Sequence, residues 1–328
     1  MKKIIFRVLQ VLVTVGVLAW VFRDPAMRAG MAAALRKADP KWITIGIAVA
    51  GAGEVANIWR WGIFLKVQGV HISWRRTAEL FMVGVFFGLF LLGTAGGDVM
   101  KVLLLVKGRQ YQKSTVFLTV VADRLSGLFV LVPFSLAIVG LRYGWMSQTP
   151  AARGLLWVLV AFAAGCVAFI GGSFAIAATG LMKRLPVRTP GREKLLEMAA
   201  AYDLFRGAWR ASLLAILLSF PVLFTFFGTF YCAALAFHAN ISLPDMFSIM
   251  PVVTVISSLP VSVSGLGVRE EMFKQLLGDL AHVSGNLAVL ISLTGFLIYV
   301  FWSILGGIAY LWSRPEAGEI ARPDSKNS

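Results

Sequence analysis

Long apolar runs separated by short charged stretches dominate this chain. A run of about 20 apolar residues is long enough for a helix to cross the hydrocarbon core of a bilayer. Three runs, near residues 99, 247 and 268, are too short to cross alone. The pattern predicts helices at Ile4–Phe22, Trp42–Leu65, Ala78–Leu92, Val99–Val106, Val116–Leu141, Gly154–Ala178, Ala211–Phe237, Phe247–Leu259, Val268–Leu277 and Leu287–Trp312.

The positions of lysine and arginine predict how these helices are oriented. Basic residues collect in the cytoplasmic loops of membrane proteins. Both chain ends and the three main basic loops are therefore expected on the cytoplasmic side. These basic stretches are Lys2–Lys3, Lys66–Arg76, Lys107–Lys113, Lys183–Arg210 and Arg314–Lys326.

With this orientation, the short apolar runs must belong to two broken hairpins, each of which enters and leaves the membrane on the same side. Ala78–Val106 has cytoplasmic loops at both ends and turns at Gly93–Asp98. Phe247–Leu277 has outer loops at both ends and turns at Ser262–Gly267. Broken hairpins that enter from opposite faces are typical of inverted-repeat transporters. The fold class predicted is an all-α, polytopic membrane bundle with two re-entrant hairpins, and its inverted symmetry rests on topology alone.

The composition agrees with a membrane protein and excludes a soluble domain. Hydrophobic residues make up 58% of the chain and charged residues 14%, and the mean hydropathy is +0.79. Soluble domains carry about 25% charged residues. The net charge of +15 is explained by basic cytoplasmic loops, so nucleic acid is not an expected partner.

The domain organisation follows from the same pattern. We expect one transmembrane domain over residues 1–314 and a disordered cytoplasmic tail over residues 315–328. Ile4–Phe22 is expected to be a retained helix, because Phe22-Arg23-Asp24-Pro25 does not resemble a cleavage site. The segment at about 183–210 alternates basic and apolar residues, which predicts an amphipathic helix on anionic lipid headgroups.

Motifs of enzymes and metal sites are not found in the sequence. The two cysteines lie inside apolar runs and the three histidines are scattered, so neither a disulfide nor a metal ion is expected. The sequence lacks a Walker motif and a nucleophile elbow. We therefore expect no catalytic residues, no cofactor and no enzymatic activity.

Charged residues within the apolar runs are the strongest functional signal. A charge at the bilayer centre costs about 2.5–3.5 kcal/mol on insertion scales, so these side chains are expected to pair with one another or with a ligand headgroup. The glycines at the turns permit unwound backbone, and a helix that begins after a turn directs its N–H groups and partial positive charge at an anion such as phosphate. The alternative is structural: internal ion pairs, and glycines that permit close helix packing.

These considerations give two groups of candidate residues. The arginines rank first because a guanidinium binds phosphate through two hydrogen bonds. The candidates for headgroup binding are Arg269, Arg124, Lys101, Gly265, Gly267, Gly96 and Gly97, and the candidates for charge balance are Asp98, Asp123, Glu270 and Glu54.

Three stretches carry a resemblance to a known membrane family. They are Leu92–Lys101 (LGTAGGDVMK), Val121–Gly127 (VADRLSG) and Ser257–Glu270 (SSLPVSVSGLGVRE). They resemble the flippase-like family built on the transmembrane region of lysylphosphatidylglycerol synthase, the bacterial multiple peptide resistance factor. In many relatives a proline-glycine precedes the first glycine pair, and here Gly93-Thr94-Ala95 stands in its place.

The resemblance implies a lipid translocator in a bacterial inner membrane. In the full-length synthase a soluble domain aminoacylates the lipid, and we expect no such activity from these 328 residues. The implied ligand is a membrane phospholipid or a polyprenyl-phosphate lipid, and a lipid-synthesising enzyme is an implied partner. Two alternatives remain open: an accessory membrane subunit of a cell-envelope glycosyltransferase or lipid-modifying enzyme, and an enzyme that acts on a lipid headgroup.

Overall fold

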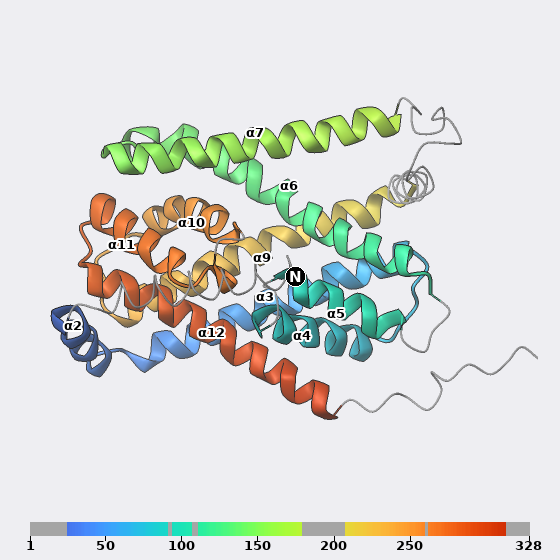
Figure 1. Ribbon diagram of the computed structural model, residues 1–328, viewed down its shortest axis with the longest axis horizontal. Coiled ribbons are helices and arrows are strands. Elements are labelled where there is room, and N and C mark those ends of the chain that lie inside the picture. Colours follow the sequence, from blue (N-terminus) through green and yellow to red (C-terminus); the bar gives the residue numbers. More distant parts are fainter. Residues whose placement is uncertain (1–24, 91–93, 107–110, 179–206, 260–261, 313–328) are drawn as a thin grey trace, which may run out of the picture. The chain divides into compact units, whose positions relative to one another are not determined.

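The protein is built from helices, as Figure 1 shows for a computed structural model of the chain. The structure describes residues 25–90, 94–106, 111–178, 207–259 and 262–312. The predicted helix Ile4–Phe22 and most of the basic stretch that ends at Arg210 lie outside these residues. The elements are α2 (Pro25–Arg36), α3 (Pro40–Val67), α4 (Trp74–Phe90), α5 (Thr94–Val106), α6 (Lys113–Met146), α7 (Pro150–Ala178), α9 (Trp209–Ala236), α10 (Leu243–Ser258), the 3₁₀ turn η2 (Val263–Gly265), α11 (Val268–Ala281) and α12 (Gly285–Trp312).

The helix lengths confirm the predicted fold class, an all-α polytopic membrane protein. Five described helices, α3, α6, α7, α9 and α12, are long and apolar enough to cross a membrane. The helices α4, α5, α10 and α11 contain only 17, 13, 16 and 14 residues. At a rise of about 1.5 Å per residue, none of these four spans the roughly 30 Å of a bilayer core.

The chain divides into two compact units. Unit 1 comprises Met1–Ala56, Gly127–Ser173 and Ser219–Phe301, and unit 2 comprises Asn57–Ser126, Phe174–Leu218 and Trp302–Ser328. Each unit contains one pair of short helices: α10 and α11 belong to unit 1, and α4 and α5 belong to unit 2. Each predicted hairpin therefore belongs to a different unit.

In unit 1, α10 and α11 form a hairpin whose two ends lie at the connection between α6 and α7. Arg142, at the end of α6, donates to Asp245 at the start of α10 at 2.6 Å. Thr149, just before α7, donates to Asp279 near the end of α11 at 2.9 Å. Because these contacts hold both ends of the pair at one connection, α10 and α11 run out and back.

The turn of this hairpin lies where the sequence predicted it. Gly265 and Gly267 have φ values of +73° and +85°, and α11 begins at Val268. Positive φ is easily adopted only by glycine, so these two residues can end one helix and start the next within a few positions. The turn at Ser262–Gly267 is confirmed as a break between α10 and α11, and its depth in a membrane stays a prediction.

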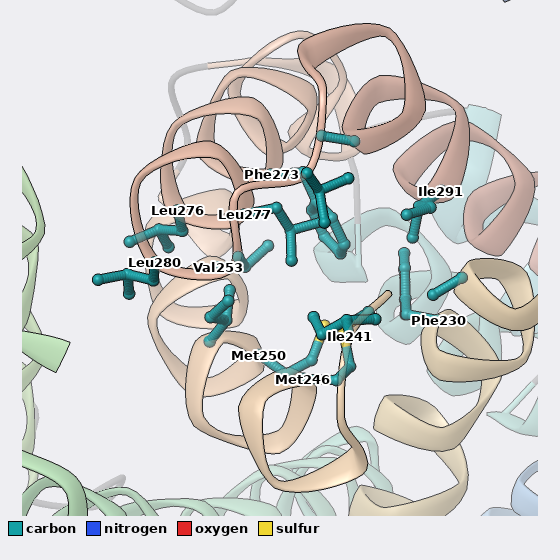
Figure 2. Close-up of a cluster of buried hydrophobic side chains, with 14 of the residues drawn as sticks. Phe230, Ile241, Met246, Met250, Val253, Phe273, Leu276, Leu277, Leu280 and Ile291 are labelled. Carbon is teal, nitrogen blue, oxygen red and sulfur yellow. The ribbon is translucent and has the colours of Figure 1, made fainter. Parts of the chain in front are cut away.

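Apolar side chains fix the hairpin in unit 1 (Figure 2). Met246 and Met250 of α10 and Phe273 and Leu277 of α11 are fully buried, and Phe230 of α9 lies in the same cluster. Burying a side chain of this size contributes about 1.5–3 kcal/mol where the reference state is water. The short helices are thus held by a packed interior as well as by the polar contacts at their ends.

In unit 2, α4 and α5 pack so closely that their backbones touch. A Cβ atom added to Gly97 of α5 would lie 2.0 Å from the carbonyl oxygen of Gly84 on α4. The ends of this pair that lie away from the turn also meet. The Tyr111 hydroxyl, after α5, donates to the carbonyl of His71, before α4, at 3.3 Å. This pair of helices therefore also runs out and back.

The first hairpin differs from its prediction in where its second helix begins. We expected unwound backbone through Gly96 and Gly97 and a helix from Asp98, but α5 begins at Thr94 and both glycines are helical. The reason is tertiary packing: the contact between Gly97 and Gly84 compensates for the poor helix propensity of glycine. For Gly97, the structure agrees with the packing interpretation.

Candidate functional site

In unit 2, Arg124 of α6 and Asp98 of α5 form a two-point ion pair. Arg124 Nε donates to Asp98 Oδ2 at 2.9 Å, and Nη2 donates to Oδ1 at 3.0 Å. These bonds use one edge of the planar guanidinium group, which has five N–H donors in all. Toward the described residues, the edge formed by Nη1 and the second N–H of Nη2 makes no hydrogen bond. The Arg124 side chain is 49% exposed, so this edge is accessible.

Lys101 is a second cation beside Asp98, and it is buried. Its Nζ atom lies 3.5 Å from Asp98 Oδ1, and its side chain is 5% exposed. The ammonium group stands 4.0 Å from the ring centroid of Phe81 and 5.5 Å from that of Trp61. Gly84 makes room for it, because a Cβ there would lie 2.5 Å from the lysine Cε. The aromatic faces stabilise a cation that has left water.

A second ion pair extends this group of charges. Arg60 of α3 donates through Nε to Asp123 Oδ1 at 2.7 Å, and both side chains are buried. Electrostatic interactions join Asp123 to Lys101 and Arg124. Arg60, Asp98, Lys101, Asp123 and Arg124 form what we call the unit 2 charge cluster. Within these five residues, three cations interact with two carboxylates.

Unit 1 contains a different polar network, centred on Arg269 and Glu270 at the start of α11. Arg269 donates to Glu270 Oε1 at 2.9 Å through Nη2 and to Ser292 Oγ at 3.1 Å through Nε. The Ser292 hydroxyl donates to the same Glu270 oxygen at 2.8 Å. The other oxygen of Glu270 accepts the backbone N–H of Gly267. Glu270 therefore serves as both the counter-ion of Arg269 and the N-terminal cap of α11.

The Arg269 network is buried and electrically balanced. Arg269 is 8% exposed and Glu270 is fully buried. The guanidinium carbon of Arg269 lies 4.5 Å from the ring centroid of Phe296 and 6.0 Å from that of Phe230. The guanidinium group is thus enclosed by a carboxylate, a hydroxyl and aromatic rings. The hydrogen bonds of Arg269 use Nε and Nη2, as those of Arg124 do, but the Arg269 side chain is only 10% exposed, so its other edge is much less accessible to an external phosphate.

The remaining predicted site residues fall into the same two units. Glu54 of α3 is buried in unit 1 and interacts electrostatically with Tyr299, although Arg60 of the same helix belongs to unit 2. Gly265 and Gly267 shape the turn before Arg269, and Gly96 and Gly97 form the first turns of α5 beside Asp98. The structure thus groups Arg124, Lys101, Asp98 and Asp123 in one cluster and Arg269 with Glu270 in another. Their roles toward a ligand stay predictions.

Sequence reasoning missed several neighbours of these residues. Ser292 completes the Arg269 network, but a serine within the apolar run of α12 carries no signal of its own. Trp61 and Phe81 flank Lys101 and read in the sequence as ordinary apolar residues. Arg60 was visible as a charge in an apolar run, and its spacing from Asp123 gave no hint that the two would pair.

Comparison with known proteins identifies the family. The family described as the lysylphosphatidylglycerol synthase TM region matches residues 7–307. The chain belongs to this family. The match extends from before α2 into α12 and includes both short-helix pairs and both polar networks. Within the family match, Asp98, Arg124 and Arg269 all occupy the motifs that carried the resemblance.

One curated relative is similar to part of the chain. A UPF0104 membrane protein of Pyrococcus horikoshii is 28% identical over 140 residues. The alignment covers 41% of this chain and 39% of that protein, so the chain spans about two fifths of the length of the relative. Its printed description says only that it is a membrane protein. The comparisons therefore establish a membrane protein of this family.

Proposed function

We propose that this protein binds lipids with a phosphate-bearing headgroup and moves them between the leaflets of its membrane. The observation that carries the proposal is the environment of Arg124. This half-exposed arginine lies on a helix long enough to span a membrane, binds Asp98 through one edge of its guanidinium group and leaves the other edge accessible to a ligand. Two parallel N–H groups on that edge match two phosphate oxygens. The lipid tails would remain in the bilayer while the headgroup contacts the unit 2 charge cluster.

The charge of the cluster supports the same assignment. A buried group with a net positive charge is costly in low dielectric unless an anion joins it. In the unit 2 charge cluster, the two cations Arg124 and Lys101 share one carboxylate, Asp98. A phosphate would add an anion beside them, with Asp98 and Asp123 orienting the cations. Membership of a family named for a phospholipid synthase agrees with a lipid ligand.

For Arg269, the geometry favours a structural role. Its contacts to Glu270 and Ser292 form without any ligand, and the side chain is buried. Removing one partner of a buried ion pair leaves an uncompensated charge that costs about 3–5 kcal/mol. We therefore expect Arg269→Ala to lower the yield of folded protein. If Arg269→Ala folds normally but does not transport lipid, Arg269 is the headgroup contact after all.

Location and partners belong to the proposal as well. We place the protein in the inner membrane of a bacterium, with both termini in the cytoplasm, because the basic stretches predict that orientation. We propose transport without catalysis, and a lipid-synthesising enzyme as the source of the substrate. Both phospholipids and polyprenyl-phosphate lipids carry the phosphate that Arg124 would recognise, and separate labelled probes of each class distinguish them.

Transport in reconstituted liposomes tests the proposal. Purified protein is placed in vesicles that contain phosphatidylglycerol with an NBD-labelled acyl chain, and loss of fluorescence after external dithionite reports lipid that has reached the outer leaflet. We expect transport above protein-free vesicles and at least about a tenfold loss in Arg124→Gln, which corresponds to about 1.4 kcal/mol. The same assay is repeated with a labelled polyprenyl-phosphate lipid in place of phosphatidylglycerol.

The matched control for Arg124 lies on the same helix. Arg142 also pairs with an aspartate, Asp245, and its side chain is 26% exposed, but it belongs to unit 1. Arg142→Gln should transport like the parent protein when rates are expressed per folded molecule. If the parent protein moves neither probe faster than protein-free vesicles do, the transporter assignment fails. Stable co-purification with a cell-envelope glycosyltransferase would then favour the accessory-subunit alternative.

A further inference from the structure

The connection between α2 and α3 carries basic side chains that the candidate site does not use. Arg36 ends α2, Lys37 follows it, Lys41 lies in the first turn of α3, and all three are exposed. Leu35, beside Arg36, is 57% exposed. We call these four residues the α2–α3 basic surface. We infer that it binds phosphate groups of anionic lipids at the membrane face opposite to the basic stretch Lys183–Arg210. This inference concerns lipid binding and does not depend on lipid transport.

A contact with α9 fixes the membrane face of this connection. The backbone N–H of Asp39, between α2 and α3, donates to the carbonyl of Ala236 at 2.8 Å, and Ala236 is the last residue of α9. The helix α9 begins at Trp209, where the basic stretch ends, and is long enough and apolar enough to cross a membrane. The α2–α3 connection therefore lies at the end of α9 that is opposite to that stretch.

Packing and hydrogen bonds hold the connection in place. Met31 of α2 is buried in the hydrophobic core of unit 1. Gly30 lies so close to Asn286 of α12 that an added Cβ would collide with the side-chain amide. Asp39 Oδ1 accepts the backbone N–H of Lys41 at 2.9 Å. One side of α2 is thus occupied by the protein, and the exposed side chains of the α2–α3 basic surface are available to a partner.

Basic side chains at this face are unexpected unless they have a partner. Lysine and arginine collect in the cytoplasmic loops of membrane proteins, which here include the stretch before α9. Two other arginines of unit 1 have internal partners: Arg142 donates to Asp245 at 2.6 Å, and Arg153 donates to the carbonyl of Ser147 at 3.1 Å. The basic side chains of the α2–α3 basic surface form no ion pair with the residues that the structure describes.

The position of Lys41 favours an external anion in particular. The first turn of a helix carries a partial positive charge, so a lysine there is less favourable than an acidic residue. Arg36, in the last turn of α2, is already in a favourable place, because the end of a helix carries a partial negative charge. An anion in front of α3 would interact favourably with Lys41 and with the start of the helix.

The apolar neighbours of these cations indicate that the anion is a lipid. Leu35 is exposed beside Arg36, and Trp42, partly exposed, follows Lys41. Apolar and aromatic side chains together with lysine and arginine are typical of the boundary between headgroups and acyl chains. A soluble anion would contact only the cations, whereas a lipid supplies a phosphate and an apolar chain together. Each cation near an anionic lipid surface raises the affinity up to about fivefold.

A fluorescent label next to the surface tests the inference. The label is attached to Ala33→Cys, an exposed position one turn before Lys37, in a background with Cys166→Ala and Cys232→Ala. The full chain is placed in vesicles of phosphatidylcholine with a smaller amount of phosphatidylglycerol. In parallel samples, one lipid or the other carries a nitroxide near the headgroup end of an acyl chain. Quenching per nitroxide, phosphatidylglycerol over phosphatidylcholine, reports the enrichment, and we expect at least about threefold.

Variants assign the enrichment to the α2–α3 basic surface. Glutamine in place of Arg36, Lys37 and Lys41 together should lower it to about one. The matched control removes two exposed cations at the other end of α3, as Lys66→Gln with Arg75→Gln. Lys66 lies about 38 Å from Lys41 along the helix, well beyond the Debye length of about 8–10 Å, so the control should keep the full enrichment. Should the triple variant aggregate, loss of the enrichment of the parent protein in about 1 M salt decides the question.

The outcomes bear on the surface alone. Equal quenching by the two lipids in the parent protein, or an enrichment that persists in the well-folded triple variant, overturns the inference. Ala33→Cys should also be labelled by a membrane-impermeant reagent on intact cells, and labelling only after the cells are opened overturns the assignment to the opposite face. If the protein moves no lipid but shows the enrichment, the proposed function fails and this inference stands.

Discussion

The contact between Gly97 and Gly84 predicts that alanine at position 97 destabilises the protein. An added Cβ would lie 2.0 Å from the Gly84 carbonyl oxygen and 3.0 Å from the Gly88 nitrogen. Both neighbours are backbone atoms, which cannot rotate away, so α4 and α5 would have to separate by about 1 Å or more. Overpacking of this kind costs about 1–3 kcal/mol, against a gain of up to about 1 kcal/mol in helix propensity. We expect a net loss of about 1–2 kcal/mol.

A glycine on another helix provides the control for Gly97→Ala. Among the described residues, no atom lies within 4 Å of a Cβ added at Gly165 of α7. Gly165→Ala should therefore leave stability unchanged or raise it by up to about 1 kcal/mol. Both variants are purified in the same detergent, and the temperature at which half of the monodisperse protein is lost is compared. Equal melting temperatures for Gly97→Ala and Gly165→Ala would refute the close approach of α4 and α5.

Three further predictions concern the buried polar groups and the orientation. Asp123→Ala should lower the free energy of unfolding by about 3–5 kcal/mol, measured by thermal melting, because Arg60 would lose its buried counter-ion. Ser292→Ala should cost about 1–3 kcal/mol in the same measurement, since Ser292 joins the Arg269 network. By contrast, Ser303→Ala should be nearly neutral, because the Ser303 hydroxyl has no hydrogen-bond partner among the residues that the structure describes. A cysteine at Arg192 should be labelled by a membrane-impermeant reagent only after the cells are opened, and labelling of intact cells would overturn the predicted orientation.

The fold class could be predicted because membrane helices have a strong one-dimensional signal. Runs of about 20 apolar residues predicted α3, α6, α7, α9 and α12, and short runs next to glycine predicted the break between α10 and α11. Left-handed backbone at Gly265 and Gly267 is a local property, so the sequence was sufficient to locate the turn. That the two hairpins enter the membrane from opposite faces stays a prediction.

The start of α5 could not be predicted because it depends on a neighbouring helix. Gly96 and Gly97 favour unwound backbone locally, and the contact with Gly84, 13 residues earlier, favours helix instead. The helix α2, with two alanine-rich turns, was also missed because it is too short and too polar to appear as an apolar run. For α5, tertiary packing outweighs the local signal, whereas the alanine-rich α2 has a favourable local helix propensity that a search for apolar runs does not detect.

The residues of the candidate site could be predicted from the sequence, but their spatial arrangement could be predicted only in part. Charges within apolar runs identified Asp98, Lys101, Asp123 and Arg124, because each is expensive to insert into a membrane. The sequence ranked Arg269 beside Arg124, and only the geometry separates them. Arg269 is enclosed by Glu270 and Ser292, whereas Arg124 keeps an accessible edge. Pairing and exposure depend on where helices pack, which a single sequence does not give.

The position of a bound lipid phosphate tests the central claim most directly. The measurement is a structure of the protein determined in nanodiscs that contain phosphatidylglycerol. We predict a phosphate group at about 3 Å from Nη1 and Nη2 of Arg124, with Asp98 still bound to the Nε edge. A phosphate bound instead at Arg269 in place of Glu270, or a lipid-bound structure with no headgroup at Arg124, would contradict the account.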